Sequence, residues 1–293
     1  MFESLRRWRK QRAAQREAHT LADYAIPDAL WRDTLARYPF LDWLDVSAQA
    51  QLRRLSSLLL AQKQFTLVQD LDADDAIFVA IAAQACLPVL ALDLSLYGGW
   101  REIVVYPGGF EIRKTVQDAD GVVHDVVQEA SGEAWEGGPL LLAWDDASHG
   151  EHFAYNVVIH EFAHKIDMLS GAADGHPPFD RALHAGLDRR AWCTALDACH
   201  ARFAAAAAAV PPHRWRRFER DSLLDPYAAE DPAEFFAVAS ETFFVAPLEC
   251  RAEMPELYAL LAAYYRQDPA VAAAAWYAAP PAREAAAAPP DTR

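Results

Sequence analysis

The sequence contains 293 residues, of which 53% are hydrophobic, and it carries a formal net charge of −15. A chain of this length and composition can bury a large core. The acidic balance argues against direct binding of nucleic acid, because a phosphate backbone attracts clustered cations.

The cysteines indicate the compartment. Cys86, Cys193, Cys199 and Cys250 form no C-x-x-C pair, and most of them lie in apolar or helical contexts. This usage is typical of reduced cysteines in a protein core. We therefore expect a cytoplasmic protein without structural disulfides.

Residues 1–20 form a basic arm on this acidic chain. Phe2, Leu5 and Trp8 lie among six cations, which are Arg6, Arg7, Arg9, Lys10, Arg12 and Arg16. The arm is either a short amphipathic helix that contacts an anionic membrane or partner, or a frayed, solvated terminus, and we favour the frayed terminus. No signal-peptide pattern follows it, and no apolar run approaches the roughly 18 residues of a membrane span.

Residues 21–269 are expected to form one domain, which is helical up to about residue 87. Ser47 is in position to cap a helix whose buried stripe contains Leu52, Leu55 and Leu59. An alanine-rich helix follows from about Asp74 and ends before Pro88.

Short segments rich in branched residues come next, separated by Gly or Pro. They predict a small sheet with strands at residues 89–94, 101–106, 122–128 and 140–144. The last strand is either an edge strand that pairs with an extended peptide or an ordinary buried strand, and both expectations stay open.

The segment from Val157 to Asp167 contains the pattern H-E-x-x-H on a predicted buried helix. His160 and His164 lie one turn apart on the same face, so both imidazoles can reach one metal ion. Glu161 is offset from that direction and is in position to take a proton from water. The pattern predicts a metal site, and a chance match by core or surface histidines is the alternative.

The spacing assigns two faces to this helix. An apolar stripe contains Val158, Phe162, Ile166 and Leu169, and the opposite face contains Asn156, His160, His164 and Asp167. Gly171 stands where a left-handed C-terminal cap is expected. Asp167 is expected to hold a histidine tautomer or to contact a substrate amine.

A catalytic zinc site takes three protein ligands, so a third must come from elsewhere. Asp167 and Ser170 exclude the three-histidine pattern H-E-x-x-H-x-x-G-x-x-H. A second helix follows its N-cap Asp231, and its residues Glu234 and Glu241 share a face because they are seven apart. One glutamate is expected to bind metal and the other to orient a histidine, whereas the alternative for Glu234 is an ordinary acidic residue in the first turn.

The remaining segments carry weaker signals. His149 and His152 lie in a polar loop and are expected at the surface. Further helices are predicted over residues 179–203 and 254–265. Residues 270–293 are dominated by alanine and proline, which predicts a mostly disordered tail with some alanine helix possible.

The run H-E-F-A-H-K-I-D at residues 160–167 and the segment from Asp225 to Phe244 closely resemble the Mlc titration factor A family. Further matches in the same order are C-L-P-V-L at residues 86–90 and G-G-P-L-L-L-A-W at residues 137–144. The family comprises bacterial zinc metallopeptidases whose catalytic fold is similar to that of anthrax lethal factor. The resemblance implies an α+β, zincin-like (gluzincin) fold that is mainly helical with a small mixed β-sheet.

Carried over by position, the resemblance implies one Zn²⁺ per chain, held by His160, His164 and Glu234, with Glu161 as general base and acid. Tyr227 matches the family's tyrosine that points at the zinc site, and its phenol is expected to donate a hydrogen bond to the oxyanion. The family is described as having aminopeptidase activity and as binding the glucose-responsive transcriptional repressor Mlc. The expected partners are therefore a peptide or protein substrate and a repressor of the Mlc type.

Two functions from different classes follow from these observations. In the first, the chain is a zinc-dependent peptidase, expected to be an aminopeptidase, that also affects the regulation of sugar uptake through a repressor. In the second, it is a non-proteolytic binding module that sequesters a transcriptional regulator. The acidic surface fits a basic partner and ordinary solubility equally well.

Overall fold

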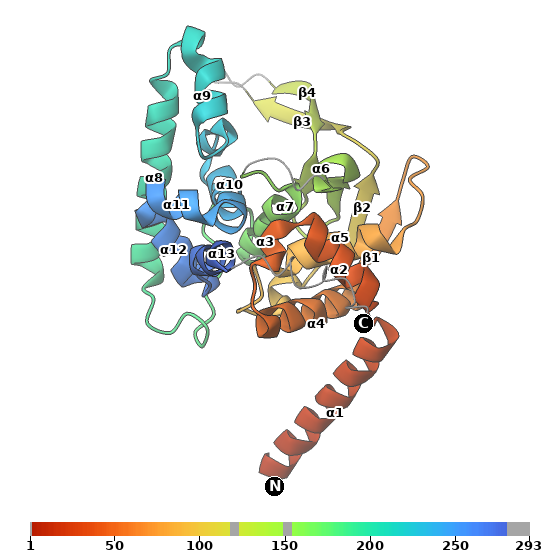
Figure 1. Ribbon diagram of the computed structural model, residues 1–293. Coiled ribbons are helices and arrows are strands. Elements are labelled where there is room, and N and C mark those ends of the chain that lie inside the picture. Colours follow the sequence, from red (N-terminus) through yellow and green to blue (C-terminus); the bar gives the residue numbers. More distant parts are fainter. Residues whose placement is uncertain (1, 118–122, 149–153, 280–293) are drawn as a thin grey trace, which may run out of the picture.

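Helices predominate and a small sheet lies beside them, so the architecture is α+β (Figure 1). The computed structural model describes residues 2–117, 123–148 and 154–279. The N-terminal part contains α1 (Phe2–Asp23), α2 (Asp28–Arg37), α3 (Pro39–Asp42), α4 (Val46–Gln62) and α5 (Asp75–Cys86). The later helices are α6 (Trp144–Ser148), α7 (Val157–Asp167), α8 (Arg189–Ala208), α9 (Trp215–Asp221), α10 (Pro232–Val245), α11 (Pro247–Glu253), α12 (Pro255–Tyr265) and α13 (Pro269–Ala278).

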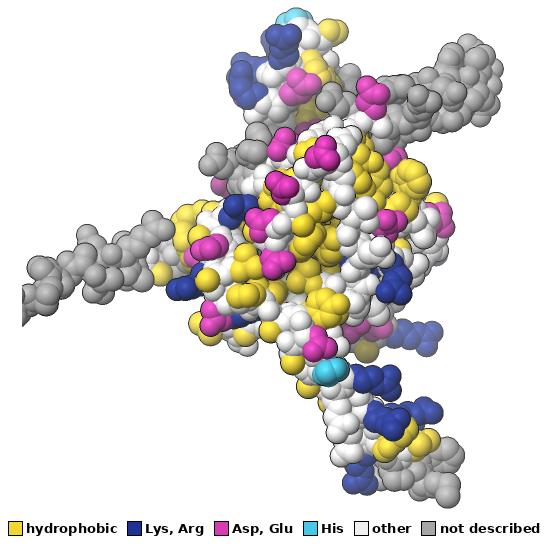
Figure 2. Space-filling model, turned by 90° about the vertical axis from the view of Figure 1, so that its right-hand side faces the viewer, with side chains coloured by type: hydrophobic (Ala, Val, Ile, Leu, Met, Phe, Trp, Pro, Cys, Tyr) yellow, Lys and Arg dark blue, Asp and Glu magenta, His cyan; other side chains and the backbone are white. Residues whose placement is uncertain are grey.

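Helix α1 projects away from the body of the molecule, and Figure 2 shows Lys and Arg side chains gathered along it. Leu5 and Trp8 are exposed, and the guanidinium of Arg12 lies over the ring of Trp8. Near the other end of the helix, Glu17 forms an ion pair with Arg54 of α4. The arm is therefore helical and largely solvent-exposed, rather than frayed. None of the described helices combines the length and apolar character that a membrane span requires.

The cap of α4 differs from the expectation. Asp45 has an extended backbone and its side chain accepts a hydrogen bond from the amide of Ala48, 2.8 Å away. Ser47 therefore lies inside the first turn, and Asp45, a capping residue as favourable as serine, caps the helix. The predicted buried stripe is confirmed, because Leu52, Leu55 and Leu59 are all buried.

The main sheet has four strands in the order β1-β2-β6-β5. These strands are β1 (Gln64–Leu67), β2 (Glu102–Tyr106), β6 (Leu140–Ala143) and β5 (Gly132–Ala134). The first three run parallel, and β5 pairs antiparallel with β6. A separate antiparallel pair consists of β3 (Phe110–Gln117) and β4 (Val123–Ala130).

The strand predictions are confirmed only in part. Strands β2 and β6 lie at the expected residues, and β4 lies near residues 122–128 but outside the main sheet. Residues 89–92 form turns instead, with the amide of Leu92 bonded to the carbonyl of Val89 at 3.0 Å, and a 3₁₀ helix (η1, Leu94–Tyr97) begins at Leu94. Their branched side chains reflect burial, since Val89 is fully buried within the core. The sequence analysis did not indicate three strands, which are β1, β3 and β5. Strand β1 is four residues long and follows α4 after Lys63.

Strand β6 is an interior strand, because β5 folds back and covers its free side. All residues of β6 are buried. Of the two expectations for residues 140–144, the buried strand is confirmed, and the edge of the sheet belongs to β5.

The C-terminal helices correct two boundaries. Helix α8 begins after its N-cap Asp188, because residues 180–187 form turns in which the amide of His184 bonds to the carbonyl of Asp180 at 2.9 Å. The prediction that this helix begins at residue 179 is therefore wrong, because it begins at Arg189. Helix α12 agrees with the expected residues 254–265. Residues 270–278 of the predicted tail belong to α13, in which Ala270 and Ala273 are buried, and residues 280–293 lie outside the described part.

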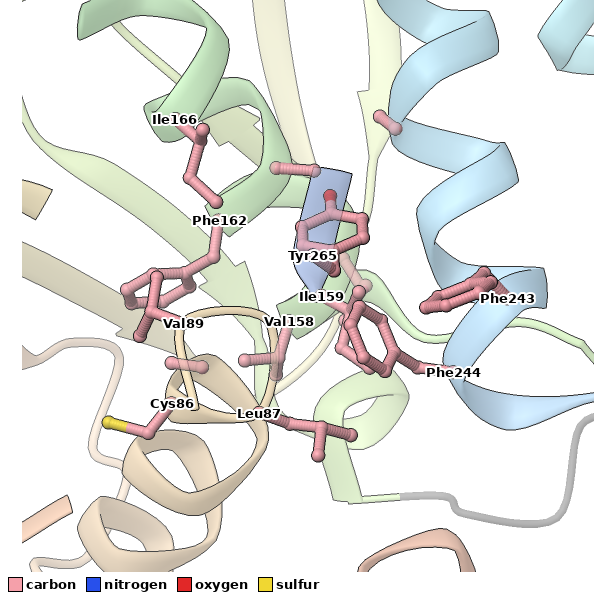
Figure 3. Close-up of a cluster of buried hydrophobic side chains, with 14 of the residues drawn as sticks. Cys86, Leu87, Val89, Val158, Ile159, Phe162, Ile166, Phe243, Phe244 and Tyr265 are labelled. Carbon is pink, nitrogen blue, oxygen red and sulfur yellow. The ribbon is translucent and has the colours of Figure 1, made fainter. Parts of the chain in front are cut away.

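A layer of apolar side chains packs behind α7. Phe162 and Ile166 are fully buried, and Figure 3 shows Phe162 beside Val89 and Phe244 of α10 near Ile159. Burying a side chain of this size contributes about 1.5–3 kcal/mol. This shared core fixes α7 and α10 relative to each other, and with them the side chains on their opposite faces.

Candidate metal centre

Helix α7 is anchored at its start by Asn156. The side-chain oxygen of Asn156 accepts a hydrogen bond from the amide of Ile159 at 2.9 Å, and its side-chain nitrogen donates to Gln84 of α5 at 2.7 Å. This is an N-cap that is itself held by a neighbouring helix. Four residues later His160 begins the face that the two histidines share.

The predicted faces of α7 are confirmed except at its end. Val158, Phe162 and Ile166 are fully buried, whereas Leu169 is 43% exposed. The α-helix ends at Asp167 and a 3₁₀ turn follows (η2, Met168–Ser170), which changes the spacing that placed Leu169 on the stripe. Gly171 closes this turn with φ 138° and ψ −149°, a conformation open to glycine but not the predicted left-handed helical cap.

Helix α10 begins as predicted. The side chain of Asp231 accepts hydrogen bonds from the amides of Ala233 and Glu234 at 2.8 and 3.0 Å, and Pro232 occupies the first helical position. This cap orients the first turn so that the side chain of Glu234 reaches the histidine face of α7.

Three side chains converge at this point. His160 Nε2 and His164 Nε2 are 3.1 Å apart, and the distances from these nitrogens to Glu234 Oε2 are 3.1 and 3.2 Å. All three side chains are no more than 16% exposed. Among the described residues, His160, His164 and Glu234 form a group that can hold a metal ion.

The electrostatics of the metal-free group follow from this proximity. Burial disfavours the charged imidazole, but the carboxylates of Glu241 and Glu234 outweigh it and hold the pKa of His160 well above its usual value. Burial also raises the pKa of Glu234, yet hydrogen bonds with the two imidazoles bring it well below its usual range. Without a metal, the cluster is therefore stabilised as an ion pair between carboxylate and imidazolium.

Glu241 contacts the other ring nitrogen of His160, Nδ1. Its Oε1 lies 2.6 Å from His160 Nδ1, and its Oε2 accepts a hydrogen bond from the backbone amide of Asn156. When Nδ1 donates its proton to Glu241, the lone pair of His160 Nε2 is directed at the shared point with His164 and Glu234. The two glutamates of α10 therefore take the two different positions that the sequence left open.

Glu241→Gln is expected to weaken metal binding about 10- to 100-fold, because carboxylates that orient a ligating histidine raise its basicity. A glutamine has one acceptor oxygen in place of two and cannot serve both His160 Nδ1 and the amide of Asn156. Metal affinity measured by competition with a chromogenic chelator checks this, with the exposed Glu253→Gln as the control. Equal affinities for the two variants would contradict the assignment.

Glu161 is buried at 4% exposure beside this group, and its Oε2 has no hydrogen-bond partner among the described residues. Burial raises the pKa of Glu161, and the neighbouring His160 and His164 lower it in part. The carboxylate opens on a cavity of about 430 Å³. The acidic residues that line this cavity are Glu133, Glu161, Asp225, Asp231, Glu234 and Glu241.

Tyr227 enters the same cavity from a 3₁₀ turn (η4, Pro226–Ala229). Its hydroxyl donates a hydrogen bond to Glu234 Oε1 at 3.1 Å. Burial, followed by the charge of Glu234, raises the pKa of Tyr227 well above its usual value, so the phenol keeps its proton. The structure thus brings together all five residues that the sequence singled out for the site.

Asp167 has a different role from the one expected. Its Oδ2 accepts hydrogen bonds from the amides of Asp174 and Gly175 at 2.9 and 2.7 Å, and the side chain is fully buried. It therefore fastens the loop after α7, and it makes no hydrogen bond to any histidine in the described part of the chain. The expectation that it orients a histidine tautomer or meets a substrate amine is wrong, because the chain turns after residue 167 and covers it.

Asp167→Asn is expected to stabilise the protein above pH 6. Burial raises the pKa of Asp167 from 3.8 to about 6, so between these values the folded state binds more protons than the unfolded chain and stability falls as the pH rises. At about 1.4 kcal/mol per pH unit, the charge costs up to about 3 kcal/mol at neutral pH. Thermal unfolding at pH 4 and pH 7.5 checks this: the variant should gain in melting temperature at pH 7.5 only. An equal change at both pH values would contradict the explanation.

The other histidines do not join the centre where they are described. His176 Nε2 pairs with Asp197 at 2.7 Å, and His184 Nε2 bonds to the carbonyl of Tyr264 at 3.0 Å. His149 and His152 lie outside the described residues. The sequence analysis missed two residues that contribute to the surroundings of Glu161, namely Gly132 of β5 and Lys165 of α7. No local sequence pattern distinguishes either of them.

Comparisons with known proteins agree with this geometry. Residues 5–266 match the family described as glucose-regulated metallo-peptidase M90. Mlc titration factor A of Salmonella arizonae is 35% identical over 253 residues, covering 83% of this chain and 92% of that protein. The protein of the same name from Serratia proteamaculans is 35% identical over 257 residues, covering 87% and 90%, and that from Salmonella typhi is 33% identical over 273 residues, covering 90% and 91%.

These matches extend over most of the chain and confirm the resemblance drawn from the two helical motifs. The matching family consists of metallopeptidases, and the two histidines and the glutamate of this site can hold a metal ion. The chain therefore belongs to the glucose-regulated metallo-peptidase M90 family.

Proposed function

We propose that this chain is a zinc-dependent peptidase with a gluzincin-like fold, which removes residues from the N-terminus of peptides. The observation that carries the proposal is the triangle of His160 Nε2, His164 Nε2 and Glu234 Oε2, whose sides are 3.1–3.2 Å. Ligand atoms about 2.0–2.1 Å from a tetrahedral Zn²⁺ stand about 3.3–3.4 Å apart, close to these values. Two imidazoles and one carboxylate are also a donor set typical of catalytic zinc.

The residues of the chain then divide the work. His160, His164 and Glu234 would hold one zinc ion, and Glu241 would orient His160. The chemistry that zinc supplies when bound is Lewis acidity toward water and toward a carbonyl oxygen. Glu161 takes a proton from the attacking water and hands it to the leaving amine. Its burial keeps that proton transfer away from bulk solvent.

The edge of the sheet supports an extended substrate. Ladder bonds run from the amide of Ala143 to the carbonyl of Ser131 and from the amide of Trp135 to the carbonyl of Pro139. Because the polar groups of an antiparallel strand alternate in direction, those of Gly132 and Ala134 face away from β6. A peptide can pair with this open edge by strand addition.

The charge of the cavity supports a free N-terminus as the group that binds. Its lining includes six carboxylates and, among the described residues, no lysine or arginine. Such a cavity attracts the α-ammonium of a peptide. Purified protein should therefore hydrolyse aminoacyl p-nitroanilides, lose this activity with a chelator and regain it with zinc. Cleavage of N-acetylated peptides at the same rate would contradict the exopeptidase assignment.

Tyr227→Phe is expected to lower kcat about 10²- to 10³-fold with a smaller effect on KM, as is usual when one oxyanion donor is removed. The hydroxyl that now bonds to Glu234 Oε1 is 3.1 Å from it and can turn toward a substrate oxyanion beside the same ligand. Steady-state kinetics with Tyr277→Phe as an exposed control check this. An unchanged kcat would refute the oxyanion role.

A second function is favoured by the names of the relatives, which are called Mlc titration factor A. We infer that this chain also binds a transcriptional repressor of the Mlc type. A pull-down of a purified repressor with the Glu161→Gln variant separates the two functions. Retention of the repressor by this variant supports binding without proteolysis, whereas loss of binding, with the fold intact, would contradict sequestration.

A further inference from the structure

Gly132, the first residue of the edge strand β5, lies directly against the side chain of Glu161. A Cβ atom at position 132 would stand 2.5 Å from Glu161 Oε1, 2.6 Å from Cγ and 2.8 Å from Cδ. Real Cβ atoms do not approach other atoms this closely. The backbone of Gly132 does not have a positive φ, so space and not backbone conformation requires glycine here.

The strand cannot easily move away from Glu161. Helix α7 is tied to the β5–β6 turn by Lys165, whose Nζ donates hydrogen bonds to the carbonyls of Trp135, Gly138 and Pro139 at 2.6, 2.9 and 3.2 Å. Lys165 is 3% exposed and lies one turn after Glu161 on the same helix. The ammonium group therefore holds the turn in place, because breaking these buried hydrogen bonds would cost free energy. The hairpin and the helix form one rigid wall around the carboxylate.

The carboxylate is positioned by packing. Glu161 is 4% exposed, and its Oε2 makes no hydrogen bond among the described residues. The three atoms nearest to the place where a Cβ of residue 132 would stand all belong to the Glu161 side chain. The direction of the carboxylate therefore depends on the shape of the strand that lies beside it.

We propose that Gly132 is a positioning residue for Glu161, and that its missing side chain lets the substrate-binding edge of the sheet press the carboxylate toward the metal ligands. This inference rests on the proposed peptidase function. The same residue turns its backbone amide and carbonyl to the open edge, where the substrate pairs. One glycine thereby sets the distance between the paired peptide and the group that moves the proton.

The contact itself can be tested without catalysis, in the metal-free protein. Gly132→Ala should lower the melting temperature by about 3–6 °C, since forcing a methyl group into a filled site is destabilising. In a Glu161→Ala background the atoms that would be overlapped are gone, and Gly132→Ala should be neutral or slightly stabilising, because alanine restricts the unfolded chain. Equal losses in both backgrounds would overturn the proposal, since they would indicate a general weakening of β5.

Kinetics of the zinc-loaded protein give the second readout. Gly132→Ala should lower kcat for an aminoacyl p-nitroanilide about 100-fold while KM and zinc affinity stay within a few-fold, because a displacement near 1 Å at the reacting group has an effect of this order. The control is Gly108→Ala, where a Cβ meets only the Asp145 side chain, nearest at 3.2 Å. A loss confined to zinc affinity, or an equal loss in the control, would overturn the proposal. If the unmodified protein hydrolyses nothing, the peptidase function fails, whereas the melting experiment still decides the contact.

Discussion

Replacing Glu161 with glutamine is expected to leave zinc bound and to lower kcat about 10²- to 10⁴-fold, the usual contribution of a positioned general base. The amide has nearly the same shape as the carboxylate, so it fits against Gly132 and keeps the fold. It cannot accept the proton of the attacking water. Glu161 supplies none of the three converging ligand atoms. Metal affinity should therefore depend less on its charge than the hydrolysis rate does.

This experiment needs two measurements on the same preparation, which are zinc content and the rate of hydrolysis of an aminoacyl p-nitroanilide. Glu253→Gln on the exposed surface of α11 makes the same chemical change away from the site. Full activity in Glu161→Gln would show that another group accepts the proton. A loss of zinc that equals the loss of activity would assign Glu161 to the ligands instead.

Replacing Glu234 with alanine is expected to have the largest effect on metal binding. A four-ligand zinc site is worth about 10–16 kcal/mol, or roughly 3 kcal/mol per ligand, so affinity should fall about 10²- to 10³-fold. The substitution also removes the acceptor of the Tyr227 hydroxyl and the carboxylate between the two imidazoles. Activity should therefore be lost at zinc concentrations that saturate the unmodified protein.

Titration with zinc distinguishes this effect from misfolding. Glu234→Ala should retain the circular dichroism spectrum of the metal-free protein and require far more zinc for half-saturation. Glu241→Gln is the matched comparison on the same helix, with the smaller loss described above. If Glu234→Ala binds zinc as tightly as the unmodified protein, the third ligand has been assigned to the wrong residue.

The centre could be predicted from the sequence because its signals are local. The two histidines, their spacing and the cap at Asp231 all lie within single helices, where periodicity fixes the geometry. The spacing alone did not predict which glutamate of α10 faces which nitrogen of His160, and only the family resemblance implied Glu234 as the metal ligand. This arrangement depends on how α10 packs across α7 through side chains such as Phe244, a long-range contact.

The sheet was harder to predict for the same physical reason. Residues 89–94 have the composition of a strand because they are buried, and burial alone does not separate a turn in the core from a strand. Strand β1 is short and gains its structure by pairing with β2, which the sequence does not reveal. Gly132 carries no signal, because its meaning comes from Glu161, which is 29 positions later in the chain.

A crystal structure of the zinc-loaded protein, with anomalous scattering measured at the zinc edge, addresses the central claim most directly. We predict a single strong peak about 2.0–2.1 Å from His160 Nε2, His164 Nε2 and a carboxylate oxygen of Glu234, with its open side toward the cavity. A peak at another place, or density in which Glu234 turns away from the two imidazoles, would contradict the account.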